Sequence, residues 1–133
     1  MNIIKKIVVL LNYDSEIPDK SKSGYNLYSN IDCFIEKKSR RIISTGLGIT
    51  IPDNYYITIV PRSELSIRGI DVNPEVIGNG NGNHEIKVLV INNADIPCEI
   101  QKGDKIAQFV INKYQNIPIE FSSFAFPDES SEI

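Results

Sequence analysis

The chain has 133 residues, of which 41% are hydrophobic, and its formal net charge is −3. This length and apolar content predict one domain with a single core. The acidic pI of about 5.1 argues against a nucleic-acid groove or an anionic membrane surface, because both attract concentrations of Lys and Arg. We therefore expect neither nucleic acid nor a membrane as a partner.

The first apolar segment, residues 3–11, is rich in β-branched side chains and predicts a strand. It is interrupted by lysines and too short to cross a bilayer, so we expect no signal peptide and no membrane insertion. Cys33 and Cys98 lack metal-ligand spacing, which favours buried thiols in a reducing compartment. With His84 as the single imidazole, a zinc site or a His-based triad is not expected. We predict a soluble intracellular protein, cytoplasmic or nuclear.

The remaining segments predict short strands separated by turns. The strand candidates have β-branched, aromatic or alternating composition and span residues 24–29, 33–36, 41–51, 55–60, 85–91, 98–100 and 104–113. The basic run at 37–41 predicts a solvated turn, and 63–66 a helical turn capped by Ser63. The segment 85–91 is apolar on both faces, which is typical of a strand whose two faces are both covered. We expect a partner subunit to cover one of them. We predict an all-β barrel over residues 1–114 and an extended C-terminal arm over 115–133.

Two stretches carry the candidate chemistry. Pro61 holds the preceding residue extended, so a strand should end there, and Arg62 with Ser63 follows as a cation and a hydroxyl that suit phosphate oxygens. From Gly78 to Asn83, Gly and Asn alternate, which leaves a backbone that tolerates positive φ and carries no carboxylate.

Several segments read together resemble the motifs of dUTPases. They are residues 24–29, 45–52, 61–63, 92–93 and 103–108, and their order and spacing agree over most of the chain. The resemblance implies a dUTPase-like jelly-roll barrel of the β-clip type and a homotrimer with sites at subunit interfaces. It also implies Mg²⁺-dependent hydrolysis of dUTP to dUMP and pyrophosphate.

The third family motif departs from this pattern. Gly78 stands where the family has the Asp that orients the attacking water, and Asn81 or Asn83 falls where a Tyr packs on deoxyribose. Neither Gly nor Asn can take a proton, so Asp71 and Glu85 are the possible substitutes. Glu64 replaces the Gly that follows Arg-Ser in the family.

The nucleotide-contact candidates follow from the same resemblance. Arg62, Ser63 and Gln108 are candidates for phosphate contacts, and Ile77 and Asn81 for contacts with the rest of the nucleotide. Phe124 lies where the family's uracil-stacking Phe is expected, on an arm that lacks the family's Arg and glycines. Structural roles remain open, because Arg62 could form an ion pair and Gln108 an interface hydrogen bond.

These departures favour a member of the family that has lost dUTP hydrolysis and binds a partner, either a protein or a nucleotide. We expect no catalytic residue and no resident metal or cofactor, with Mg²⁺ present only if nucleotide binding is retained. Ser131, Glu132 and Ile133 form a C-terminal sequence of the kind that PDZ domains accept. The alternatives are an active or weakly active Mg²⁺-dependent dUTP diphosphatase with a rewired site, and a nucleotide sensor without hydrolysis.

Overall fold

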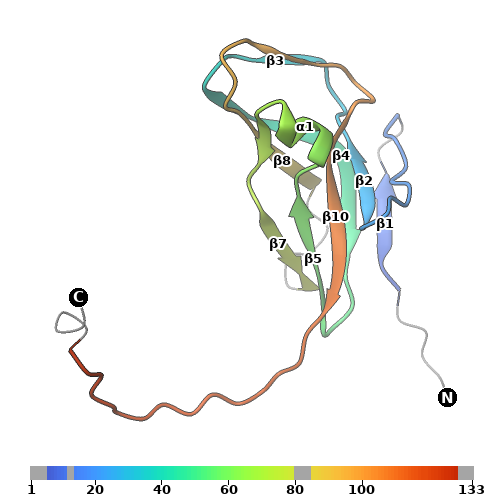
Figure 1. Cartoon of the computed structure of the whole chain (residues 1–133). Helices are drawn as coiled ribbons and strands as arrows, with labels where there is room; N and C mark the ends of the chain where they lie inside the picture. The colour runs from blue at the N-terminus through green and yellow to red at the C-terminus, as the bar shows by residue number, and fades with distance from the viewer. Residues whose placement is uncertain (1–5, 12–13, 80–84, 129–133) are drawn as a thin grey trace.

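The computed structural model describes residues 6–11, 14–79 and 85–128. Its strands form two four-stranded sheets and a two-stranded sheet (Figure 1). The first sheet contains, in spatial order, β1 (Val8–Leu11), β4 (Ser39–Thr50), β8 (Glu85–Asn92) and β6 (Ile70–Val72). The second contains β2 (Tyr25–Tyr28), β10 (Lys105–Lys113), β5 (Tyr55–Val60) and β7 (Glu75–Gly78). The small sheet pairs β3 (Cys33–Ile35) with β9 (Cys98–Ile100), and α1 (Ser63–Ile67) follows β5. The predicted all-β fold is confirmed.

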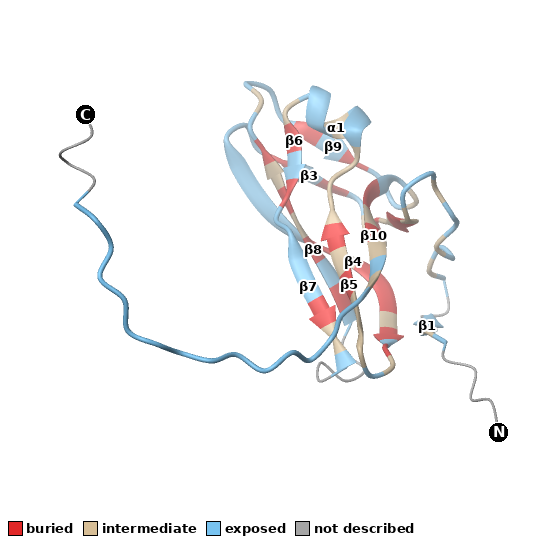
Figure 2. Ribbon diagram, turned by 60° about the horizontal axis from the view of Figure 1, so that its bottom comes forward, coloured by how far each residue is buried: buried red, intermediate tan, exposed pale blue. Residues whose placement is uncertain are grey.

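One hydrophobic core draws its residues from both large sheets (Figure 2). On β8 the alternation places Ile86, Val88 and Val90 in this core, each at most 3% exposed. Leu89 and Ile91 lie on the opposite face of β8 and are half-buried in the single chain. The strand is therefore apolar on both faces, as its sequence predicts.

The two cysteines are buried and free, as predicted, on the paired strands β3 and β9. No helix among the described residues is long and apolar enough to span a membrane.

Some local predictions are wrong. Strand β4 begins at Ser39, two residues before the predicted strand 41–51, so Ser39 and Arg40 also belong to the strand and the turn is confined to residues 37–38. The N-cap of α1 is Arg62, without a side-chain capping hydrogen bond, and Ser63 is the first helical residue instead of the cap. Strands β6 and β7 have no counterpart in the prediction, because they form by pairing with β8 and β5, which no local pattern indicates.

Three neighbouring strands bring candidate site residues into one row. Gln108 of β10 pairs with Asn26 of β2 on one side and with Val60 of β5 on the other. Directly paired residues place their side chains on the same face of a sheet. Pro61 ends β5 one residue after Val60, so Arg62 emerges beside this row.

The other end of β5 carries β7. Tyr56 pairs with Gly78, and Arg62 lies six residues further along the chain, a span of about 20 Å in extended backbone. Figure 1 shows α1 at one end of β5 and the end of β7 at the opposite end. The two stretches singled out in the sequence are therefore well separated within one chain.

Candidate functional site

A pocket of about 810 Å³ lies where the row of paired residues meets the start of α1. Three segments far apart in the sequence form it: the loop before β2 with the start of that strand, the β5–α1 junction, and the first half of β10. Its lining residues are Asp19, Lys20, Ser21, Lys22, Ser23, Asn26, Arg62, Ser63, Glu64, Lys105 and Gln108. Four cations, two carboxylates and several hydroxyl and amide groups suit an anion with many oxygens.

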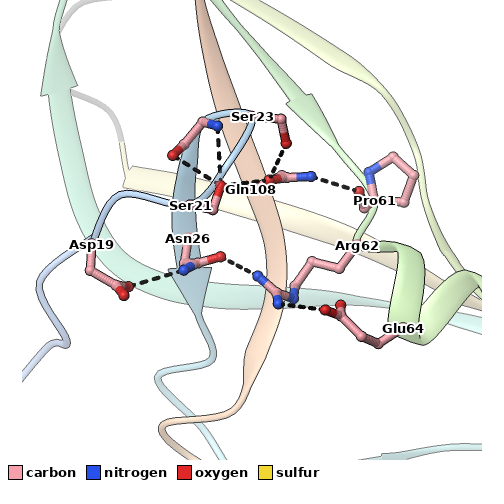
Figure 3. Close-up of polar contacts among 9 residues, drawn as sticks. Asp19, Ser21, Ser23, Asn26, Pro61, Arg62, Glu64 and Gln108 are labelled. Atoms are coloured by element: carbon pink, nitrogen blue, oxygen red, sulfur yellow. Dashed lines mark hydrogen bonds and ion pairs between the residues drawn. The ribbon is translucent and has the colours of Figure 1, made fainter.

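Arg62 is the central cation of this pocket. Its side chain is 15% exposed, and its Nη1 donates a hydrogen bond to Oδ1 of Asn26. Its Nη2 lies 3.2 Å from Oε1 of Glu64, and Nδ2 of Asn26 donates to Oδ1 of Asp19 at 3.2 Å. Figure 3 shows this chain of contacts, in which the guanidinium is held by an amide on one side and a carboxylate on the other. The ion pair that the sequence leaves open for Arg62 is therefore present, in the same pocket as the predicted phosphate contacts.

Gln108 ties the loop before β2 to the end of β5. Its Oε1 accepts hydrogen bonds from Ser21 Oγ at 3.0 Å and Ser23 Oγ at 3.1 Å, and its Nε2 donates to the carbonyl of Pro61 at 3.3 Å (Figure 3). Both ends of the amide are thus engaged. In this conformation Gln108 organises the pocket wall.

The two carboxylates of the pocket are held in their charged form. A hydrogen bond from Tyr28 and then one from Asn26 hold the pKa of Asp19 below its usual value. A backbone hydrogen bond and then the charge of Arg62 lower the pKa of Glu64, and Lys105 contributes a smaller lowering to both carboxyls. Burial, reinforced by the hydrogen bond to Asp19, raises the pKa of Tyr28 to about 12. At neutral pH the pocket therefore presents anionic Asp19 and Glu64 and a neutral Tyr28.

The predicted nucleotide contacts do not all lie together. Arg62, Ser63 and Gln108 line the pocket, whereas Ile77 is a buried core residue on β7, next to Gly78. Asn81 lies outside the described residues. The structure therefore brings together the phosphate candidates and leaves Ile77 at the far end of β5.

The two carboxylates named as substitutes for the missing Asp lie at opposite ends of β8. Glu85 is its first residue and accepts a hydrogen bond from Ser44 Oγ. Asp71, on β6, pairs with Ile91 near the other end of β8, and its Oδ1 accepts a hydrogen bond from the Val72 N–H at 2.8 Å. They cannot serve one site within a single chain.

Sequence reasoning missed a third carboxylate, Asp53. It lies in the turn before β5, and its Oδ1 accepts a hydrogen bond from Nδ2 of Asn79, the residue after Gly78. The antiparallel pairing of β5 with β7 brings these residues together across the sheet. Asp53 falls between the predicted strands 41–51 and 55–60, but the register that places it beside β7 has no local signal in the sequence.

The C-terminal arm runs away from the barrel, and all its described residues from Tyr114 to Asp128 are exposed (Figure 2). Phe124 is 72% exposed, and its ring stacks edge-on against Phe126 with centroids 5.0 Å apart. It therefore lies outside the pocket of its own chain. Ser131, Glu132 and Ile133 are outside the described residues, so the PDZ-type interaction stays a prediction.

The fold and the pocket define a class of protein: a β-barrel whose side contains a cationic, hydroxyl-rich hollow suited to phosphates. The dUTPase family model matches residues 14–130, so the chain belongs to the dUTPase family.

Relatives in this family are named as enzymes. The chain is 37% identical over 124 residues to the deoxyuridine 5′-triphosphate nucleotidohydrolase of Yaba monkey tumor virus, with 88% of this chain and 86% of that protein covered. The Finegoldia magna protein of the same name is 33% identical over 132 residues, covering 94% and 91% of the two chains. The Variola virus protein is 40% identical over 96 residues, covering 71% of this chain and 62% of that one.

Solved structures establish the fold. A mutant dUTPase from phage phi11 of S. aureus matches with a TM-score of 0.80 and 20% identity, covering 90% of this chain and 98% of that one. A mutant dUTPase of Staphylococcus bacteriophage 80alpha with dUpNHpp also gives a TM-score of 0.80, with 19% identity, and covers 93% and 92%. The predicted dUTPase-like barrel is confirmed.

The prediction that this chain has lost dUTP hydrolysis and acts by binding a partner is wrong. Relatives at 33–40% identity are named as nucleotidohydrolases, which favours an enzyme and the dUTP diphosphatase alternative. The prediction rested on side chains missing at motif positions. It weighed Asp71 and Glu85 as substitutes for the missing Asp and did not consider Asp53, which the pairing of β5 with β7 brings beside Asn79.

Proposed function

We propose that this protein hydrolyses dUTP to dUMP and pyrophosphate with the help of Mg²⁺. The observation that carries the proposal is the pocket in which Arg62 and Ser63, Asn26, and Gln108 meet from three separate segments. The names of the family relatives support dUTP as the substrate.

Arg62 and Ser63 supply the phosphate contacts. The guanidinium offers several N–H donors in a plane, which matches the oxygens of a phosphate group. Asn26 holds it from the protein side, so its orientation is fixed before the substrate arrives. Ser63 is exposed at the first position of α1, where its hydroxyl can turn to a phosphate oxygen.

The residues present fit a Mg²⁺ that arrives with the substrate. Asp19 and Glu64 are the carboxylates of the pocket, and among the described residues no three of His, Cys, Asp and Glu gather in one place. Mg²⁺ commonly binds through one or two carboxylates together with substrate phosphates, and it keeps several waters. When bound, it neutralises charge on the triphosphate and orients its oxygens. Asp19 would face it, whereas Glu64 is paired with Arg62.

A complete site requires a second copy of the chain. Arg62 and the segment around Gly78 lie at opposite ends of β5, too far apart to act on one triphosphate within one chain. The half-buried apolar face of β8, with Leu89 and Ile91, offers a surface for assembly, and Arg40 and Asp71 place opposite charges on either side of Ile91. These features support the homotrimer with interface sites that the family implies.

We infer that Asp53 of a neighbouring copy activates the attacking water. A base must come within hydrogen-bond reach of its water, and Gly78 offers no such group. A hydrogen bond links Asp53 to Asn79, directly beside Gly78. Glu85 is the second candidate, because it begins β8 just after this segment, whereas Asp71 lies far along β8. Ile77 and Phe124 remain proposed contacts for the rest of the nucleotide. Phe124 would make its contact from the C-terminal arm, residues 115–133, which we propose is a segment separate from the barrel of residues 1–114.

The test is pyrophosphate release from dUTP by the purified protein, with and without Mg²⁺, alongside dCTP and UTP. We expect Mg²⁺-dependent turnover of dUTP. Arg62→Gln should lower kcat/KM by about 10- to 100-fold, the value of a hydrogen bond to a charged group. Arg68→Gln, which removes an exposed cation outside the pocket, is the matched control. Absence of pyrophosphate release from dUTP under these conditions would overturn the proposal.

A further inference from the structure

Three lysines line the pocket without a carboxylate partner. Lys20, Lys22 and Lys105 all contribute to its wall, and none of them forms an ion pair with another described residue. Arg62, by contrast, is paired with Glu64. The positive charge available to a ligand therefore comes mainly from the lysines.

The carboxylates of the pocket form no ion pair with Lys20 or Lys22. Asp19 accepts hydrogen bonds from Asn26 and Tyr28, and Glu64 contacts Arg62. Four cations face two carboxylates, in a chain whose formal net charge is −3. Unpaired cations gathered in one hollow of an acidic protein repel one another, and an anionic ligand removes that repulsion.

The loop that carries Lys20 and Lys22 has a defined conformation. The Ser21 N–H donates to the carbonyl of Gly24 at 2.6 Å, and the Asn26 N–H donates to the carbonyl of Asp19 at 2.9 Å. The Gln108 amide holds the loop through the hydroxyls of Ser21 and Ser23. The loop is therefore an ordered wall of the pocket, and it keeps the lysines beside Arg62 and Ser63.

The loop also ends in close contact with β10. A Cβ added at Gly24 would lie 2.2 Å from the carbonyl oxygen of Phe109, so the backbone approaches the strand more closely than any side chain allows. This contact fixes the base of the loop against the same strand that supplies Lys105 and Gln108.

We propose that Lys20 and Lys22 bind the polyphosphate chain of the nucleotide, as a clamp on the side of the pocket opposite α1. Arg62 and Ser63 hold the phosphates from the β5–α1 junction, and the two lysines hold them from the loop. The alternative is that both lysines are solvated surface groups with no ligand. The proposal rests on the proposed function for the identity of the ligand, but binding of a polyphosphate can be measured independently of hydrolysis.

The test compares a double variant, Lys20→Gln with Lys22→Gln, with a control of equal charge, Lys37→Gln with Lys113→Gln. Lys37 lies in the turn before β4 and Lys113 at the end of β10, both outside the pocket. Titration calorimetry gives Kd for tripolyphosphate at two salt concentrations, and steady-state kinetics give KM for dUTP.

The pocket variant should weaken tripolyphosphate binding and raise KM by about five- to tenfold, since each exposed ionic contact contributes a modest free energy. The effect should shrink at high salt because mobile ions screen exposed charges. If tripolyphosphate binds through the lysines while dUTP is not hydrolysed, the proposed lysine contacts are supported and the proposed function is overturned. If dUTP is hydrolysed and the pocket variant matches the control in Kd and KM, the clamp is wrong and the function stands.

Discussion

Glu64 lies 3.2 Å from the Arg62 guanidinium, so the central cation of the phosphate pocket already has an anionic partner. A triphosphate must compete with this carboxylate for the same N–H groups. Removing its charge should strengthen substrate binding. We expect Glu64→Gln to lower KM for dUTP about two- to fivefold, which corresponds to the free energy that an exposed ion pair usually contributes. Steady-state kinetics would check this, with Glu99→Gln as a control on β9, and an unchanged or raised KM would contradict it.

The hydrogen bond between Asn79 and Asp53 leads to a test of the proposed base. Asp53→Asn keeps the size of the side chain and removes its basicity. We expect kcat to fall by about 10²- to 10⁴-fold, the usual contribution of a general base. Asp95→Asn, at an exposed position paired with Lys38, is the control.

A second variant makes this test sharper. A Cβ at Gly78 would meet no atom within 4 Å, so Gly78→Asp should fold normally. If Asp53 is the base, adding Gly78→Asp to Asp53→Asn should restore part of kcat. Full activity in Asp53→Asn alone would move the assignment to Glu85.

Gln108 should control the stability of the loop that carries the lysines. Gln108→Ala removes the acceptor for two serine hydroxyls and the donor to Pro61. We expect the free energy of unfolding to fall by about 1–2 kcal/mol. Amide hydrogen exchange should also become faster at residues 21–24. Gln101→Ala, an exposed change in the turn after β9, should affect neither quantity.

The second apolar face of β8 should hold the assembly together. Leu89→Glu places a charge in the middle of this half-buried face, opposite Ile42, which is 62% exposed. We expect it to shift the protein from trimer to monomer in sedimentation velocity. Ile96→Glu, at an exposed loop position, is the control. A Leu89→Glu protein that remains trimeric would place the interface on another surface.

The Tyr28–Asp19 contact predicts how stability changes at high pH. The folded pKa of Tyr28 is about 12, above its usual value of 10.0. Its contribution to stability is therefore complete below pH 10 and is lost as pH rises toward 12, since the unfolded chain releases this proton first. Denaturant titrations between pH 9 and 12 should show a smaller alkaline loss in Tyr28→Phe than in the unmodified protein. Tyr114→Phe, on an exposed ring, should behave as the unmodified protein does.

Asp19 gives the opposite dependence of folding stability on pH. Its pKa is lowered from the usual 3.8, so its contribution is present above that value and is lost as pH falls through the lower, folded value. Asp19→Asn should therefore lose less stability on acidification than the unmodified protein.

Much of the fold was predictable because its strands are short, alternating and bounded by turns. The alternation in β8 indicated both of its apolar faces, and the sequence Pro61-Arg62-Ser63 indicated the end of a strand with a phosphate contact. Strand β6 was not predictable, since its three residues form a strand only by pairing with β8.

The candidate site was only partly predictable, because its composition depends on strand register. Lys20 and Lys22 join Arg62 through the pairing of β2, β10 and β5, over separations of about 40 residues. Asp53 reaches Asn79 through the pairing of β5 with β7. Motif positions show which groups are absent, but not which groups from other segments occupy the same space.

The C-terminal arm exposes Ile117, Ile119, Phe121, Phe124 and Phe126, each at least 71% accessible. A lone subunit would carry this apolar surface in water, whereas an assembled one can cover it against a neighbour. Part of the folding free energy would then come from association. Dilution should therefore lower the thermal midpoint, and a version of the chain ending at residue 114 should be less sensitive to concentration.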